Sequence, residues 1–525
     1  MIQMTVGNGG ATEQTAHFWI ATEPGEELKA ENRRLRASTG ALRAVVDAPS
    51  PLAVEPLPGS EGKVMAGRLS FAVPPGASRS WVVKLPFVSD LTPAESLDLE
   101  RLDYDTQRRT VVSYWRELVQ ETVRFAVPEE KFNLLARSVV PHIHITAAKD
   151  PGSGLYMVGA ASYNYQVFAN ETAFQATLLD ILGDHKTAQE YFETLLALQG
   201  SRNYPGMHKG PYDAIFHGAR VDEQYDYTAS NYGLDHGTIL WSLAEHYLYS
   251  RDRTWLQRAW PRMRKAIEWI LAQRATTRLT RADGGKVPEY GLLPASHLED
   301  NADWAHWFTI NAFCWAGIRS SAEAMKDIGH ADAAMLEREA AAYLEDLRLA
   351  IRRAWQAAPV TRMRDGTYSP YVPVEPYQRW RRFGPKRAGY YSRYGRTSEF
   401  SPTFRLSATR EVLYGPVMYL NLGVFKPDEP AANWILDDWE DNLTLSSGAA
   451  LESACTASST MLFGLARGHG LPGQLAKSDS GVLEAPRDSC RHPQPVQQLR
   501  LLFLSGGEYI HRGVPHVAPR QRAFL

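Results

Sequence analysis

Residues 168–200, FANETAFQATLLDILGDHKTAQEYFETLLALQG, decide the fold class, because their apolar residues recur with the 3.6-residue period of an α-helix. Gly183 and Asp184 interrupt the period with residue types that commonly end one helix and begin another. The segment therefore predicts an antiparallel helical hairpin with a tight turn. Its two apolar faces consist of Phe174, Leu178, Ile181 and Leu182, and of Ala188, Tyr191, Phe192 and Leu195.

Two more helical pairs follow along the chain. In the first pair, the apolar faces consist of Ile239, Leu240, Leu243, Ala244 and Tyr247, and of Met263, Ala266, Ile267 and Ile270. In the second pair, they consist of Phe308, Ala312, Trp315 and Ala316, and of Leu336, Ala340, Tyr343, Leu344 and Leu347. Repeated hairpins of this kind predict a mainly α fold, a helical toroid or solenoid. Long loops at 200–231, 276–304 and 358–408 lie between helical segments, and we expect them to gather at one functional end.

The first ninety residues have the period-2 pattern of β-strands. Apolar residues alternate with polar ones at Leu69, Phe71 and Val73, and again at Trp81, Val83 and Leu85 after Pro74, Pro75 and Gly76. We expect these two runs to form a hairpin in an antiparallel sheet, with 16–22 and 41–46 as weaker strand candidates. Thr92 and Pro93, followed by charged helix formers, predict the start of a linker helix.

Composition and charge exclude several classes of protein. Of 525 residues, 44% are hydrophobic and 22% charged, as in ordinary globular proteins, so disorder and fibrous repeats are excluded. The net charge of −2 favours no nucleic-acid partner. Three cysteines without ligand-like spacing predict neither a disulfide framework nor a metal site. With no signal peptide and no run of ~20 apolar residues, we expect no membrane partner and a cytoplasmic location, unless the sequence begins inside a longer gene.

The sharpest group of chemically active residues lies just before the helix that begins near Phe308. Glu299, Asp300 and Asp303 fall within five residues and stand beside Trp304 and Trp307. A carboxyl group walled by indoles is partly desolvated, so it can keep a raised pKa and protonate a leaving group, while the indoles stack on a sugar ring. The alternative is structural: Asp303 caps the helix and Asp300 interacts with its positive end.

Two other helix starts carry polar residues that suit a substrate pocket. Tyr232, Asp235 and His236 open one helix, and Asn170 with Glu171 opens another. Helix capping is the competing interpretation at both places. An Arg- and Tyr-rich run from 361 to 407 could bind an anionic group, or simply be a solvated loop. Phosphate-loop, zincin and serine-hydrolase motifs are absent from the sequence.

The order of a β-sandwich, a linker helix and serial helical hairpins with carboxylates between them resembles the six-hairpin glycosidase superfamily, which has an (α/α)6 barrel. The resemblance covers roughly residues 65 to 445. Residues 114–140 look like the linker and opening barrel helix, and residues 168–200 like the first inward-facing hairpin, although Asn170 and Glu171 stand where relatives often have Arg-Asp. The resemblance implies an (α/α)6 toroid preceded by a small antiparallel β-sandwich, whose completeness the sequence leaves open.

The resemblance also implies a place for the general acid. In this superfamily the acid comes from the loop leading into the sixth helix, here 276–304. Glu299 and Asp303 match the Glu-x-x-x-Asp spacing of trehalase-like and glucosidase members, in which the later Asp is the acid. Members are mostly inverting, so a second carboxylate about 6.5 to 9.5 Å away is expected to activate water.

The C-terminal tail does not continue the pattern. From about residue 448 the helical period disappears. Codons permitted for residues 505–522, read one nucleotide out of register, can spell PEVNTFTEEYRMWRHGNG, which contains a Glu-Glu-Tyr suited to a catalytic base. Our hypothesis is that the tail is translated out of frame, through a sequencing error or a real lesion, so that the chain lacks its closing hairpins and its base. Glu399, Glu440 and Glu452 are weak substitutes.

We therefore expect four regions: an antiparallel β-domain (1–90), a helical linker (91–128), an (α/α)6 barrel (129–447) and an atypical tail (448–525). The expected activity is inverting hydrolysis of a glycosidic bond, with a carbohydrate as the partner and no metal or organic cofactor, because two carboxyl groups and a water suffice. Open alternatives are a phosphorylase or polysaccharide lyase of the same fold, and an inactive carbohydrate-binding protein. The sequence gives neither the sugar nor the oligomeric state.

Overall fold

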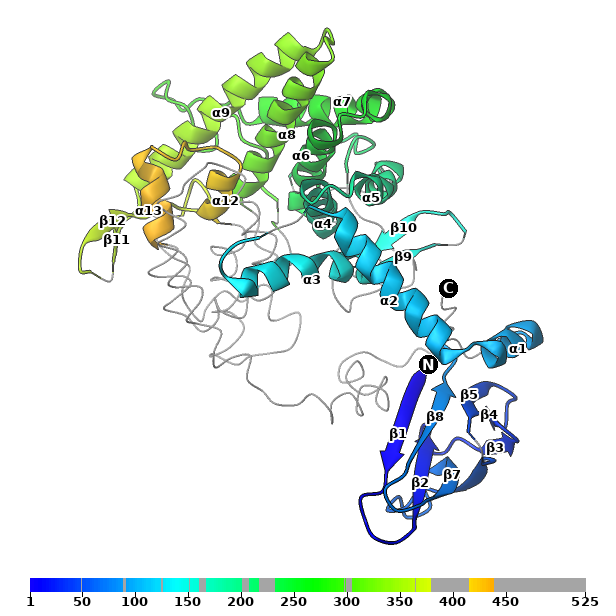
Figure 1. Ribbon diagram of the computed structural model, residues 1–525. Helices are drawn as coiled ribbons and strands as arrows, with labels where there is room; N and C mark the ends of the chain where they lie inside the picture. Colours follow the sequence, from blue (N-terminus) through cyan, green and yellow to red (C-terminus); the bar gives the residue numbers. More distant parts are fainter. Residues whose placement is uncertain are drawn as a thin grey trace. The chain divides into compact units, whose positions relative to one another are not determined.

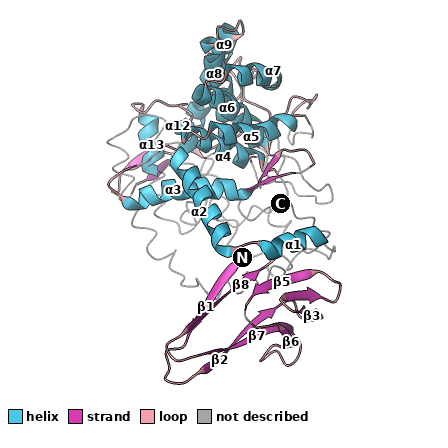
Figure 2. Cartoon of the chain, turned by 45° about the vertical axis from the view of Figure 1, so that its right-hand side comes forward, coloured by secondary structure: helices cyan, strands magenta, loops and turns pink. Residues whose placement is uncertain are grey.

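The computed structural model describes residues 1–48, 50–87, 91–123, 126–150, 152–159, 167–200, 207–216, 232–296, 298, 305–363, 365–378 and 415–438. These residues fall into two compact units, one ending at Glu117 and the other beginning at Leu118. The first unit contains antiparallel sheets and the second is mainly helical (Figure 1; Figure 2). The expected order of a β region followed by a helical region is confirmed.

The first unit contains two antiparallel sheets. Its strands are β1 (Ile2–Gly7), β2 (Gln14–Ala21), β3 (Leu28–Glu31), β4 (Arg34–Ala37), β5 (Leu42–Asp47), β6 (Ala53–Pro56), β7 (Met65–Val73) and β8 (Ser78–Lys84). One sheet has the order β1-β8-β5-β4-β3 and the other the order β2-β7-β6. The weaker strand candidates, 16–22 and 41–46, correspond to β2 and β5, so both are confirmed.

The expected hairpin of β7 and β8 is wrong, although both segments are strands. β7 pairs with β2 and β6, whereas β8 pairs with β1 and β5 in the other sheet. The chain changes sheet between them because each strand then turns apolar side chains toward the same core, where Leu69, Trp81 and Val83 are buried together. Alternation fixes which face of a strand is buried, but it does not say which strand lies beside it.

The linker begins where the sequence predicts. Helix α1 (Pro93–Arg101) starts after Thr92, whose hydroxyl oxygen accepts a hydrogen bond from Glu95 N while the Glu95 carboxylate accepts one from Thr92 N. This reciprocal capping satisfies two backbone donors at the helix start. Helix α2 (Tyr104–Glu121) follows it.

The helical unit contains the three predicted helical pairs. They are α4 (Ala169–Ile181) with α5 (His185–Ala197), α6 (Gly233–Ser250) with α7 (Arg253–Thr276), and α8 (Phe308–Asp327) with α9 (Ala333–Gln356). The other described elements of this unit are α3 (Glu130–Thr146), α12 (Pro416–Asn421), α13 (Pro430–Asp438) and two short hairpins, β9 (Ala147–Lys149) with β10 (Tyr156–Val158) and β11 (Val360–Arg362) with β12 (Tyr368–Pro370).

Helices α4, α6 and α8 lie side by side and run in the same direction. Along the first pair, Asn170 and later Asp180 of α4 bond to Asp235 and later His246 of α6. Contacts between α6 and α8 advance in the same way, from Gly237 beside Cys314 to Gly317 beside Leu240. α4, α6 and α8 therefore form a parallel row, and their N-terminal ends lie at one end of the unit.

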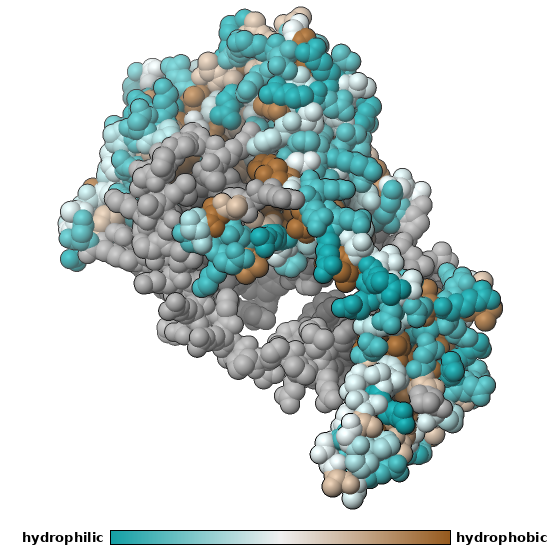
Figure 3. Space-filling view, in the orientation of Figure 1, coloured by the Kyte–Doolittle hydropathy of each residue, from teal (hydrophilic) through white to brown (hydrophobic). Residues whose placement is uncertain are grey.

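The row forms the centre of the apolar core. Most residues of α6 and α8 are buried on all sides, while α7 and α9 expose a polar face. Accordingly, the face of the described surface seen in Figure 3 is largely hydrophilic, with apolar residues confined to small areas. A helix that is buried all round is an inner helix, and an amphipathic one is an outer helix.

We expect Gly237→Ala to destabilise the helical unit. A Cβ atom at this position would lie 2.7 Å from the backbone nitrogen of Cys314, so α6 and α8 must move apart. Overpacking of this kind costs about 1–3 kcal/mol in the free energy of unfolding, which denaturant titration measures. Gly152→Ala is the control, because the added Cβ meets only ordinary contacts. Equal stability of the two variants would contradict the tight packing.

Candidate functional site at the N-terminal ends of the inner helices

Three loops meet at the N-terminal ends of α6 and α8. Met207 N donates to Ala295 O at 2.8 Å, and Leu234 N donates to Leu298 O at 3.2 Å. At the start of α8, Phe308 N donates to the carbonyl oxygen of Val374, in the third loop, at 2.9 Å. Parts of all three long loops are thus joined at one end of the unit. The expectation that they gather there is confirmed for their described residues.

Asp235 links the first turns of α4 and α6. Its carboxylate accepts hydrogen bonds from Asn170 Nδ2 at 2.9 Å and from the backbone nitrogen of Tyr232 at 3.0 Å, and it has no exposed surface. Asp235 is the third residue of α6, whose N-cap is Tyr232, so the interpretation of Asp235 as the N-cap residue is wrong. The carboxylate still satisfies a donor at the helix start, and it also fixes the side chain of Asn170.

His236, the next residue, is held by backbone groups on both sides of its ring. Its Nδ1 accepts a hydrogen bond from Phe216 N at 3.0 Å, and its Nε2 lies 3.3 Å from Ala266 O. The ring of Trp269 packs edge-on against it at 5.1 Å. Since Nδ1 accepts, the proton lies on Nε2, and the neutral ring connects the loop before α6 to α7.

The segment that carries the predicted acid is closed at its base by a backbone bridge. Ser296 and Ala305 exchange two hydrogen bonds, of 3.2 and 3.1 Å. Trp307 Nε1 donates to Ser296 O at 2.9 Å, and the Trp307 side chain is buried. Ser296 and Ala305, which flank residues 297–304 in the sequence, are therefore held together.

The predicted acids lie outside the described residues, as do Asp300 and Trp304. The capping interpretation of Asp303 is nevertheless wrong, because α8 begins at Phe308 and its N-cap is Trp307. Asn170 and Glu171 do not cap α4 either, since the N-cap is Phe168. Of the other predicted contact residues, Tyr232, Asp235, His236 and Asn170 are buried close to one another, and Glu171 is half-buried in the first turn of α4. Their contact with a sugar stays a prediction.

Two buried polar residues at this end were missed by the sequence analysis. His208 lies in the loop that contacts Ala295, and its ring packs against Trp269 at 5.2 Å. Glu375 follows directly after Val374, the partner of Phe308, and only 6% of it is exposed. In the sequence, the only signal for Glu375 is one acidic residue within the apolar run YVPVEPY, which a surface turn would explain equally well.

In the part of the chain that the structure describes, no group of three or more His, Cys, Asp and Glu side chains could hold a metal ion. Among the described helices, none combines the length and apolarity needed to cross a bilayer.

We expect the stability of the helical unit to depend on pH through His208. Burial, together with the nearby His306, lowers the pKa of His208 from 6.5 to about 3. Because the unfolded chain takes up this proton near pH 6.5, the free energy of unfolding is highest above pH 6.5 and falls as the pH decreases toward 3. The expected loss between pH 7 and pH 5 is about 2 kcal/mol, measured by denaturant titration at each pH.

The His208→Gln variant should lose this part of the pH dependence. The control is His142→Gln, which changes an exposed histidine of α3 in the same unit and should leave the dependence intact. Identical pH dependence of the wild-type chain and His208→Gln would contradict the assignment.

Comparisons with known proteins give matches in structure. No protein-family model and no curated protein sequence matches the chain. A Streptococcus pneumoniae protein from a family of metal-independent α-mannosidases, solved with α-1,6-mannobiose, matches at 11% identity and a TM-score of 0.35, over 68% of this chain and 98% of that one. A bacterial glucoamylase solved with acarbose matches at 10% identity and a TM-score of 0.44, over 83% of this chain and 60% of that one. A protein from the human microbiome described as a kojibiose phosphorylase matches at 9% identity and a TM-score of 0.36, over 88% of this chain and 68% of that one.

These three proteins carry names of carbohydrate-active enzymes. The described residues of this chain have antiparallel β-sheets followed by a mainly helical region of serial pairs, in the order that the sequence predicts.

Proposed function

We propose that the protein is an inverting glycoside hydrolase whose general acid is Asp303, with Glu299 as the second candidate. The observation that supports this proposal is the bridge between Ser296 and Ala305 at the N-terminal ends of the inner helices. It anchors the segment with the predicted acids at the end where Tyr232, Asp235 and Asn170 are gathered. The described residues on both sides of the predicted acids thus lie at the same end of the helical unit as Tyr232, Asp235 and Asn170.

The proposed chemistry needs two carboxyl groups with different environments. The acid donates a proton to the glycosidic oxygen as the bond to the anomeric carbon breaks, so it must be protonated when the substrate binds. The positive ends of the parallel inner helices lower the pKa of a nearby carboxyl group, and burial raises it. We therefore expect the acid to depend on a desolvated position beside Trp304 and Trp307.

Sugar hydroxyl groups need donors and acceptors that are already held in place. We propose that Tyr232, Asp235, His236, Asn170, Glu171, Asp300, Trp304 and Trp307 line the subsites. The pair Asn170 and Asp235 is suited to this because each side chain is oriented by the other, which limits the entropy lost on binding. A carbohydrate is accordingly the proposed partner.

We propose that the general base is encoded in the shifted reading frame of the tail and is therefore missing from the chain as translated. It deprotonates a water on the opposite face of the sugar ring, at about 6.5 to 9.5 Å from the acid. Residues 439–525 lie outside the described residues, including Glu440 and Glu452, and so does Glu399. The shifted reading of residues 505–522 supplies the Glu-Glu-Tyr proposed here.

In the chain with the corrected reading frame, we expect Asp303→Asn to reduce kcat/KM for glycoside hydrolysis by about 10²–10⁴-fold, because an amide cannot protonate the leaving oxygen. Turnover is measured by sugar release from a panel of α-linked disaccharides that includes α-1,6-mannobiose and kojibiose. Asp283→Asn is the matched control: it removes an exposed carboxylate on the same connection between α7 and α8 and should leave activity unchanged. Intact hydrolysis in Asp303→Asn would refute the acid assignment.

The same panel separates the alternatives. Turnover that requires inorganic phosphate would replace hydrolysis by phosphorolysis. An unsaturated, ultraviolet-absorbing product formed from a uronic-acid polysaccharide added to the panel would indicate a lyase. Sugar binding in a calorimeter without turnover would favour an inactive binding protein.

Sequencing the gene from the codon for Trp434 past the stop, and translating all frames, tests the proposed base. We expect one inserted or deleted nucleotide whose correction restores the Glu-Glu-Tyr reading, and the corrected chain is then the one to assay. A confirmed sequence with no such change would overturn the out-of-frame hypothesis and make the binding-only protein the leading interpretation.

A further inference from the structure

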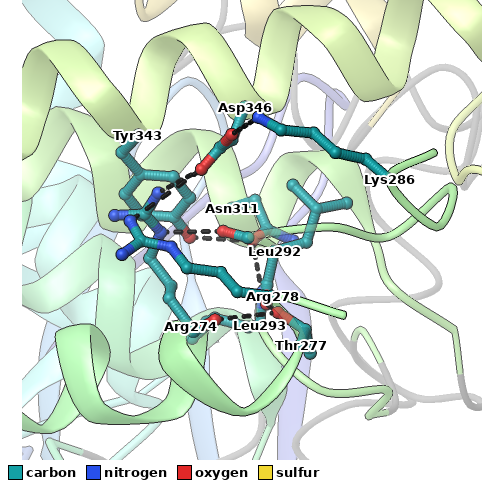
Figure 4. A network of polar contacts seen from close by, with 10 residues as sticks. Arg274, Thr277, Arg278, Lys286, Leu292, Leu293, Asn311, Tyr343 and Asp346 are labelled. Atoms are coloured by element: carbon teal, nitrogen blue, oxygen red, sulfur yellow. Dashed lines mark hydrogen bonds and ion pairs between the residues drawn. The ribbon is translucent and has the colours of Figure 1, made fainter. Parts of the chain in front are cut away.

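A buried polar network lies behind the loop that precedes α8, between α7, α8 and α9 (Figure 4). At its centre, the guanidinium of Arg274 lies 3.7 Å from the centroid of the Tyr343 ring. Arg274 Nε donates to Gly291 O at 2.8 Å, and Nη2 donates to Asp346 Oδ2 at 3.1 Å. The last turn of α7 is thus tied to the loop and to α9 by one side chain.

The charges of the network are arranged around Asp346. Asp346 Oδ1 accepts a hydrogen bond from Lys286 Nζ at 3.1 Å. Nη2 of Arg278 lies 3.9 Å from Asp346 Oδ2. Burial lowers the pKa of Arg274, opposed in part by Asp346 and Tyr343. A buried cation of this kind is stable only with its partners in place, so Asp346, Arg274 and the Tyr343 ring hold one another in a fixed arrangement.

The loop is fitted closely to this arrangement. Gly291 has a φ of +71°, and a Cβ atom there would lie 2.3 Å from Asp346 Oδ2. Thr277 Oγ1 also donates to Leu292 O at 2.5 Å. The backbone of residues 291 and 292 is therefore held by Arg274 of α7, by its C-cap residue Thr277 and by the approach of α9.

From Tyr343 the network continues into α8. The Tyr343 hydroxyl donates to Asn311 Oδ1 at 2.7 Å, and the same oxygen accepts a hydrogen bond from Leu293 N at 2.8 Å. Asn311 Nδ2 donates to Trp307 O at 2.8 Å. Asn311 thus connects the two described sides of the loop, one before residue 297 and one after residue 304.

The direction of these bonds follows from the backbone partners of Asn311 and from the burial of Tyr343. Desolvation keeps the pKa of Tyr343 well above its ordinary value, so the hydroxyl remains a donor. Asn311 Oδ1 must then be the acceptor of two bonds, which leaves the amide nitrogen to face Trp307 O. Leu293 N can only donate and Trp307 O can only accept, so these two groups set the orientation of the Asn311 amide, and the Tyr343 hydroxyl stabilises it by donating to Oδ1.

We propose that Tyr343 is a positioning residue for the proposed reaction: acting through Asn311, its hydroxyl fixes Leu293 and Trp307 and thereby the base of the segment that carries the predicted acid. This inference rests on the proposed function for its catalytic meaning. Its structural content does not, because the hydrogen bonds join described residues only.

The Tyr343→Phe variant tests this proposal in the full chain. It keeps the ring beneath Arg274 and removes only the hydroxyl. We expect amide hydrogen exchange, followed by mass spectrometry, to become about tenfold faster in peptides covering 292–296 and 305–311, since one buried hydrogen bond is lost. On the disaccharide that the wild-type chain hydrolyses, kcat should fall about tenfold with little change in KM.

Tyr247→Phe is the matched control. Tyr247 is equally buried, and its hydroxyl donates to Asp327 Oδ2 at 2.5 Å near the C-terminal ends of α6 and α8, away from the loop. This variant should lose thermal stability to a similar extent while the exchange of 292–311 and kcat stay unchanged. A merely structural role of Tyr343 would make the two variants alike.

Two outcomes overturn the proposal: unchanged exchange in Tyr343→Phe, or faster exchange with kcat unchanged. A wild-type chain that hydrolyses none of the disaccharides, in the reading frame established by sequencing, overturns the proposed function and with it the catalytic role. In that case the exchange measurement still decides whether Tyr343 holds Leu293 and Trp307.

Discussion

The close approach of α6 to α8 is the constraint on which the helical unit depends. Gly237 and Gly317 have no side chain, so the helix backbones meet where a Cβ atom would clash. Because these contacts advance in the same direction along both helices, α6 and α8 are parallel, and α4 continues the row through Asn170 and Asp180. A parallel row requires each connection to return along an outer helix. It therefore places the loops before α6 and α8, and the first turns of both helices, at one end.

This arrangement explains where polar groups are buried. At the N-terminal end, Asp235, Asn170 and His236 use their side chains to join first turns and loops. At the opposite end, Asp180 accepts hydrogen bonds from His185 and His246. Buried polar groups need partners, and partners on other helices fix the axial position of each helix in the row. Helices α4 and α6 are thus held in register at both ends by hydrogen bonds, and α8 is held against α6 by close packing at Gly237 and Gly317.

In the β unit, the sequence pattern predicts the strands and their buried faces but not their pairing. Strand positions and buried faces of β7 and β8 follow from alternation, because a strand with one face in the core must place apolar residues at every second position. Their pairing does not follow, since Pro74 to Gly76 suits both a hairpin and a change of sheet. Trp81 illustrates the outcome: it lies on the five-stranded sheet, and its ring packs edge-on against Phe71 of the other sheet.

The sequence by itself determined the type, order and approximate limits of the helical pairs, the strands before them and the capped start of α1, because these follow from periodicity and local hydrogen bonding. It also marked the end of the helical unit where polar loops gather. Only the tertiary structure decided that Trp307 is the N-cap of α8, that Asp235 holds Asn170, and that Asn311 is shared by Tyr343, Leu293 and Trp307. These partners lie between 4 and 65 residues apart, and the longer separations are closed by helix packing, which no local pattern encodes.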